Sequence, residues 1–198
     1  MGRGAWLTTT HEWAHDVDTE HLVEARRAAE SLGEALPAHL VLEVIAYADD
    51  EAEFLGRPGA VVVTLGEGSV EVADDGRGTD TRRDEDGHIV RKPVMATRDV
   101  RFFDSEAPPL LPDGLPRRGM STVAAVSPLL VHENRRREGA WRQAYRFGVP
   151  DSALEEVESG EGAGTRVEIT LPEAAEVDPA VIRQLAEGFG HVDVSVLD

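Results

Sequence analysis

The sequence predicts a two-layer α/β sandwich, in which helices cover one face of a mixed, mostly antiparallel sheet. Three observations lead to this fold class. The 198 residues suit one compact domain. Short β-branched segments occur in pairs joined by turns, and helical segments separate the pairs. Because 41% of the residues are hydrophobic, the core can be sizeable, which excludes a wholly disordered chain.

The composition excludes several classes of function. The chain has 38 acidic and 20 basic residues, a net charge of −18, so direct DNA binding is not expected. It has no cysteine, which excludes disulfides, a thiolate nucleophile and cysteine-ligated metals. No apolar run is long enough to cross a bilayer, and no signal-peptide core is visible. We therefore expect a cytoplasmic protein without membrane contact.

Two helices are expected after a polar arm at residues 1–18. Residues 20–36 are rich in helix formers, and Pro37 marks a helix boundary. Residues 39–56 predict a helix with an apolar stripe at helical spacing. A second face of this helix carries Glu43, Tyr47, Asp50 and Glu51. Such a helix can pack on a sheet and still face a pocket, although a solvated acidic face is the alternative.

A hairpin is predicted next. Residues 60–65 and 69–73 are short and β-branched, and glycines mark the turn between them. The second strand runs into the acidic, glycine-rich turn D-D-G-R-G at residues 74–78. Residues 79–118 are polar and rich in proline. A loop of this length in a compact domain is typical of a lid, a binding loop or disorder.

The second half of the chain predicts two helices and four strands. Small residues at 119–127 suit a short buried helix, and a later helix is expected at 179–189. A second hairpin has a basic turn at its tip, which we interpret as solvated. The strands are expected at residues 129–132, 140–147, 165–171 and 192–197.

Four ordered motifs suggest an ancestry. They are E-V-I-A-Y-A-D-D-E-A at residues 43–52, D-D-G-R-G at 74–78, G-L-P-R-R-G-M-S-T-V-A-A-V-S at 114–127, and Gly164-Thr165. In order and spacing they resemble the motifs of the ATPase domain of DNA gyrase B and its type II topoisomerase relatives, within the GHKL group of ATP-binding folds. The second hairpin and the closing helix and strand are also similar, so the resemblance covers residues 19–198. It implies a GHKL ATPase-like fold.

The resemblance implies an adenine pocket. By this resemblance, Asp74 accepts a hydrogen bond from the exocyclic amino group of adenine, and Thr165 helps to bind the base through a water molecule. Gly76 and Gly78 allow the backbone to approach the base and to turn sharply. For each residue a structural role stays open, such as a turn glycine or a capping threonine.

The resemblance also assigns the remaining roles. Glu43 matches the general base that orients and deprotonates the attacking water. Gly119 stands where a helix N-terminus faces the phosphates. Arg77 and Glu51 correspond to an ion pair that ties the glycine-rich turn to the acidic helix and forms part of the pocket wall.

Several positions depart from the family pattern. Tyr47 replaces the asparagine that coordinates Mg²⁺, and a phenol is a poor ligand for this ion, so Mg²⁺ stays open, with Asp50 as a substitute. In the phosphate loop Pro116 removes a backbone donor, and Arg117 and Arg118 either contact phosphate or fill its space. ATP is the expected ligand, with weak or absent hydrolysis. The chain ends after this domain, so topoisomerase activity is not expected of it alone.

Two alternatives remain. The first is a non-enzymatic binding or regulatory module that kept the fold and lost the nucleotide, with another small ligand or a protein partner in the pocket. The second is a zinc site, because residues 11–15 read H-E-W-A-H. This motif lies in the polar arm with no strand before it, so we assign no metal ligands.

Overall fold

The computed structural model describes residues 17–79, 82–83, 89–90, 93–103, 105–136, 139–151, 153–158 and 162–198. The H-E-W-A-H motif and most of the predicted arm lie outside these ranges. The strands are β1 (Gly59–Gly66), β2 (Ser69–Asp74), β3 (Arg82–Arg83), β4 (Ile89–Val90), β5 (Leu130–Arg136), β6 (Gly139–Arg146), β7 (Val149–Pro150), β8 (Glu155–Val157), β9 (Gly164–Thr170) and β10 (Val192–Leu197). The helices are α1 (Thr19–Glu30), η1 (Gly33–Ala35), α2 (Leu36–Leu55), η2 (Pro93–Met95), α3 (Val100–Phe103), α4 (Met120–Val126) and α5 (Pro179–Ala186).

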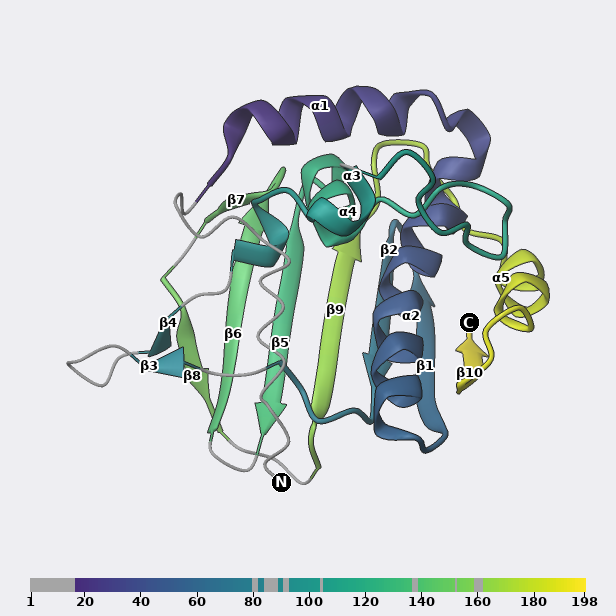
Figure 1. Ribbon diagram of the computed structural model, residues 1–198. Helices are drawn as coiled ribbons and strands as arrows, with labels where there is room; N and C mark the ends of the chain where they lie inside the picture. The colour runs from purple at the N-terminus through teal and green to yellow at the C-terminus, as the bar shows by residue number, and fades with distance from the viewer. Residues whose placement is uncertain are drawn as a thin grey trace.

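Within these ranges, eight strands form one sheet, in the order β10-β1-β2-β9-β5-β6-β7, with β8 paired to β6 (Figure 1). β1 and β10 are parallel, and the other pairs of this sheet are antiparallel. β3 and β4 form a separate small pair. The main helices lie on one side of the large sheet, with α2 against β1 and β2. The predicted two-layer fold with a mixed, mostly antiparallel sheet is therefore confirmed.

The helix boundaries follow local signals more closely than the predicted ranges do. Asp18 caps α1, since its side chain accepts a hydrogen bond from the His21 amide. α1 ends at Glu30 rather than near residue 36, and Gly33 adopts a φ of +53° in the turn that follows. α2 begins at Leu36, with Pro37 in its first turn, where the missing N–H is not needed.

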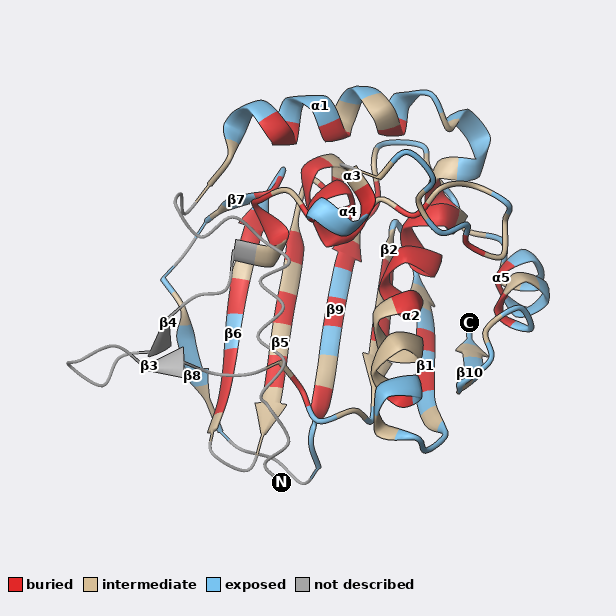
Figure 2. Cartoon of the chain, viewed as in Figure 1, coloured by how far each residue is buried: buried red, intermediate tan, exposed pale blue. Residues whose placement is uncertain are grey.

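The core lies between the helices and the facing side of the sheet (Figure 2). Along β1, Val61 and Val63 are buried while Ala60 and Val62 are exposed, the alternation expected of a sheet covered on one face. Val70 and Val72 repeat this pattern on β2, and the buried side chains of α2 complete the layer. Among the described residues no helix is long and apolar enough to span a membrane.

The stretch predicted as a polar, irregular loop at residues 79–118 contains packed structure in its described part. It includes η2, α3 and a β-bridge between Leu110 and Pro116. Met95, Phe102 and Leu111 are buried. These apolar residues stand in pairs or threes between polar and proline-containing stretches, so they produce no helical or strand periodicity. The strands β7 and β8 were not predicted because, with two and three residues, they are too short to show an alternating pattern.

Candidate functional site

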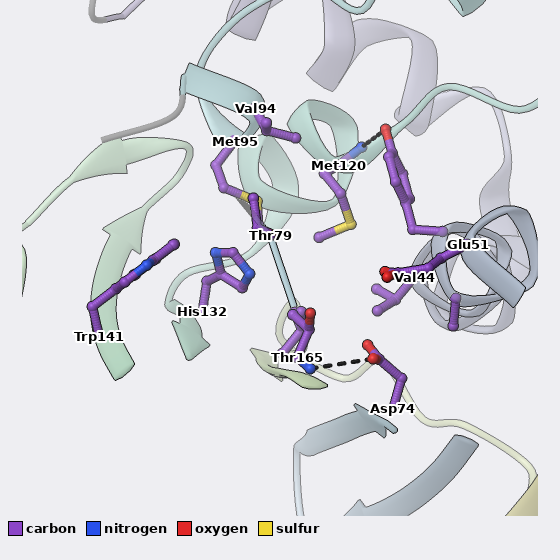
Figure 3. A pocket seen from close by; sticks show the side chains of 13 residues that line it. Val44, Glu51, Asp74, Thr79, Val94, Met95, Met120, His132, Trp141 and Thr165 are labelled. Carbon is purple, nitrogen blue, oxygen red and sulfur yellow. Dashed lines mark hydrogen bonds between the residues drawn. The ribbon is translucent and has the colours of Figure 1, made fainter. Parts of the chain in front are cut away.

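A cavity of about 140 Å³ lies between α2, β9 and the η2 segment (Figure 3). Its apolar lining comprises Val44, Ala48, Val94, Met95, Met120, Trp141 and Val167. Its polar lining comprises Tyr47, Glu51, Asp74, Thr79, His132 and Thr165. Asp74 and Glu51 lie on one side, opposite His132 and Trp141. Since an apolar cavity of roughly 150 Å³ can hold a benzene ring, this space suits a planar ring system.

Asp74 is the polar anchor of the cavity. It ends β2, and its Oδ1 accepts hydrogen bonds from the amides of Gly76 at 2.8 Å and Thr165 at 3.2 Å. Burial raises the pKa of Asp74 to about 6, although the hydrogen bonds from Gly76 and Thr165 oppose the rise. The carboxylate is thus held rigidly at the cavity wall and is ionised at neutral pH.

The D-D-G-R-G turn requires its glycines. A Cβ on Gly76 would lie 2.8 Å from Asp74 Oδ1 and 3.0 Å from Glu51 Oε2. Gly78 has a φ of +72°, and a Cβ there would lie 2.6 Å from Asn134 Oδ1. The Asn134 Oδ1 atom also accepts a hydrogen bond from the backbone amide of Thr79. The turn therefore brings the backbone close to the cavity, as the resemblance implies.

Arg77 and Glu51 form the expected ion pair. The Arg77 backbone amide and Nε both donate to Glu51 Oε1, at 3.0 Å and 2.9 Å. The guanidinium also lies over the Phe54 ring, 5.2 Å from its centroid. This pair ties the glycine-rich turn to α2 at the rim of the cavity.

Glu43, the expected general base, is fully buried in a closed network. Its Oε1 accepts a hydrogen bond from the backbone amide of Arg118, and its Oε2 accepts one from the backbone amide of Gly119 at 2.8 Å. His39 Nε2 lies 3.3 Å from Glu43 Oε1, and His39 Nδ1 lies 2.7 Å from Asp113 Oδ2. Burial opposes the charged form of His39, but the hydrogen bonds and charges of Glu43 and Asp113 outweigh it and raise the pKa of His39.

Tyr47 is likewise engaged. Its hydroxyl donates to Asp99 Oδ2 at 3.3 Å and accepts the amide of Met120 at 3.4 Å. Burial raises the pKa of Tyr47, so the phenol stays protonated. Asp99 is buried and also pairs with Arg101, whose Nη2 lies 2.6 Å from Asp99 Oδ2.

Arg117 closes the same region. Its guanidinium stacks between the rings of Tyr47 and Phe102, 4.7 Å and 4.6 Å from their centroids. Arg117 Nη1 lies 2.9 Å from Asp50 Oδ2. A neutral phenol and a carboxylate already paired with arginine do not fit the octahedral oxygen shell of Mg²⁺. The residues present therefore do not form a Mg²⁺ site in this arrangement.

The structure divides the predicted site residues into two groups. Tyr47, Glu51, Asp74 and Thr165 line the cavity, and the turn with Gly76, Arg77 and Gly78 borders it. Glu43, Asp50, Arg117, Arg118 and Gly119 lie together outside the lining, bound to other parts of the chain.

Sequence reasoning missed several site residues. Among them, His39 carried a usable signal, because it stands one helical turn before Glu43. His132 and Trp141, whose rings meet edge to face at 5.0 Å, lie on the inward side of two paired strands. Met95 and Val94 follow a stretch without periodicity and had no signal.

Comparison with known proteins gives two results at the level of sequence. No protein-family model matches the chain. DNA gyrase B of Mycobacterium tuberculosis (strain H37Rv) is 37% identical over 121 residues, which is 61% of this chain and 18% of that protein. DNA gyrase B of Haloferax volcanii is 32% identical over 136 residues, 65% of this chain and 21% of that protein. The chain thus spans about a fifth of the length of these relatives.

The fold gives a third result. The topoisomerase IV ATP-binding domain of Francisella tularensis, solved with a small-molecule inhibitor, superposes with a TM-score of 0.59 at 22% identity. The match covers 81% of this chain and 46% of that chain. In sequence, part of the chain is therefore similar to DNA gyrase B, and in fold the chain resembles the ATP-binding domain of a topoisomerase IV.

Proposed function

We propose that this chain binds an adenine compound through its base, in the cavity beneath α2. The adenine ring would lie against the apolar lining, with its exocyclic amino group donating to the Asp74 carboxylate. The similarity to gyrase B and to a topoisomerase IV ATP-binding domain supports a ligand of this class.

One observation carries the proposal. An ionisable carboxylate stands in the wall of a mostly apolar cavity, where burial opposes its charge. Two backbone amides fix its Oδ1, so its position is set before any ligand arrives. A buried carboxylate whose charge is poorly solvated is typical of a binding site. A hydrogen-bond donor on the ligand can then stabilise that charge.

We also propose that turnover is absent in this arrangement. A general base must reach the proton that it removes. Both oxygens of Glu43 accept amides of the chain, and Glu43 does not line the cavity. Before Glu43 could activate a water molecule, the backbone amides of residues 118–119 would have to release its carboxylate oxygens.

The proposal is tested by isothermal titration calorimetry with adenosine, inosine and guanosine. Inosine and guanosine carry a carbonyl oxygen where adenosine has the amino group, so Asp74 would repel them. We expect adenosine to bind and both others to bind at least about tenfold more weakly, the loss of roughly one good hydrogen bond to a charged group.

Two variants sharpen this test. Asp74→Asn removes the charge and should abolish the preference for adenosine. Asp75→Asn makes the same charge change on an exposed neighbour that does not line this cavity, and it should bind like the parent protein. Equal binding of adenosine by the parent and Asp74→Asn would contradict the proposal.

A second candidate function is a module whose cavity holds another planar ligand. The apolar wall with Met95, Met120 and Trp141 favours it, because methionine and aromatic surfaces accept many ring systems. A ligand of this kind would bind with an affinity that Asp74→Asn leaves unchanged.

A further inference from the structure

We infer that the cavity selects an uncharged adenine compound, the free base or the nucleoside, over nucleotides with two or three phosphates. The inference rests on the proposed adenine site and concerns the chemistry around it. Proteins hold polyphosphates with free backbone amides at helix N-termini, unpaired arginine or lysine, and metal ions. In the described surroundings of this cavity, the chain itself already uses the backbone amides of residues 118–120 and the guanidinium groups of Arg77, Arg101 and Arg117.

The backbone amides before α4 are occupied. Those of Arg118 and Gly119 donate to the two oxygens of Glu43, and that of Met120 donates to the Tyr47 hydroxyl. The Glu43 carboxylate therefore stands where an anion would bind, fully buried and held from both sides. A phosphate could take these amides only by displacing this buried carboxylate.

Three arginines next to the cavity are paired as well. Arg117 binds Asp50, Arg101 binds Asp99, and Arg77 binds Glu51. Each of these guanidinium groups therefore neutralises a carboxylate of the chain itself. A phosphate that approached one of them would have to compete with that carboxylate.

Arg117 also has two donor atoms, Nε and Nη2, that are buried without a hydrogen-bond partner. They lie in the stack between Tyr47 and Phe102. Neither Arg117 nor Arg118 lines the cavity. The position of these two atoms thus keeps them from presenting positive charge to a ligand in the cavity.

Charge and metal chemistry point the same way. The chain carries a net charge of −18, and the Asp74 carboxylate stands in the cavity wall. Within the described ranges, no three histidine, aspartate or glutamate side chains cluster in a way that could hold a metal ion. Each phosphate added to adenosine therefore brings negative charge toward an acidic protein, and should weaken binding.

The experiment compares adenosine, AMP, ADP and ATP by isothermal titration calorimetry, the last two with and without Mg²⁺. We expect adenosine to bind most tightly and ATP at least about tenfold more weakly, with little effect of Mg²⁺. Binding of ATP as tight as that of adenosine would overturn this inference and leave the proposed adenine site standing. Failure of all four compounds to bind would overturn both.

A variant pair tests the cause. Glu43→Gln removes the buried charge and keeps an oxygen acceptor for only one of the two amides, because its NH2 group cannot accept a hydrogen bond from the other. Its matched control, Glu53→Gln, makes the same charge change on the exposed face of α2. Circular dichroism first verifies that both variants are folded. We expect Glu43→Gln to shift the ratio of ATP to adenosine affinity toward ATP at least about threefold, and Glu53→Gln to leave the ratio unchanged. The same ratio in both variants would contradict the role given to Glu43.

Discussion

Asp74→Asn is expected to stabilise the protein while it removes adenine recognition. In the folded chain the Asp74 carboxylate is partly buried, and burial raises its pKa from 3.8 to about 6. The charged form is therefore less favourable in the folded state than in the unfolded state. Asparagine keeps an oxygen that can accept the amides of Gly76 and Thr165, so the substitution removes the charge and leaves the local hydrogen bonds.

The magnitude follows from the pKa. A rise from 3.8 to about 6 corresponds to at most about 3 kcal/mol, since each pKa unit is worth about 1.4 kcal/mol. Asp74 keeps some contact with solvent, which screens its charge, so we expect a gain of about 1–2 kcal/mol at pH 8. For a protein of this size that gain raises the melting temperature by about 2–8 °C.

The pH dependence gives the sign of the effect. Because the pKa is higher in the folded state, protonated Asp74 favours folding below the unfolded value, and this contribution is lost as the pH rises through about 6. The advantage of Asp74→Asn should therefore be largest at pH 8 and small at pH 4.5. Urea unfolding at both values, with Asp75→Asn as the control, measures it. A variant no more stable than the parent at pH 8, or an advantage that grows on acidification, would refute this reasoning.

Three further predictions follow from the same site. Adenosine affinity should fall as the pH drops below about 6, because protonation removes the charge of Asp74 that strengthens the hydrogen bond from the amino group. Calorimetry between pH 5 and pH 8 checks this, and a flat profile would count against it. Gly78→Ala should lower the free energy of unfolding, measured in urea, by at least about 2 kcal/mol, because φ at this position is +72° and the new Cβ would collide with the Asn134 side chain. A smaller loss would mean that the turn can relax. Tyr47→Phe should lower the free energy of unfolding in urea by about 1 kcal/mol, because the hydrogen bond to Asp99 is lost. An unchanged free energy of unfolding would show that this bond contributes nothing.

The local parts of the fold could be predicted from the sequence because their signals are local. The apolar stripe of α2, the β1–β2 hairpin and the glycine-rich turn each lie within about twenty residues. The segment around α3 could not be predicted in this way. Phe102 is buried there by contacts outside its own helix, such as that with Arg117, and α3 has only four residues, too few for a helical period to show in the sequence.

The candidate site shows the same division. Asp74 and Thr165 lie 91 positions apart, and motif order was enough to predict that they meet. The position of Glu43 in its motif said nothing about its partners. Those partners are set by the path of the loop around Arg118, which folds back so that its amides reach the carboxylate. A tertiary arrangement of this kind leaves no periodic trace in the sequence.

A crystal structure of the protein with adenosine tests the central claim most directly. The account predicts the adenine ring in the cavity beneath α2, with its amino nitrogen about 2.7–3.2 Å from an Asp74 carboxylate oxygen. Adenosine bound elsewhere, or bound in the cavity with its amino group turned away from Asp74, would contradict it.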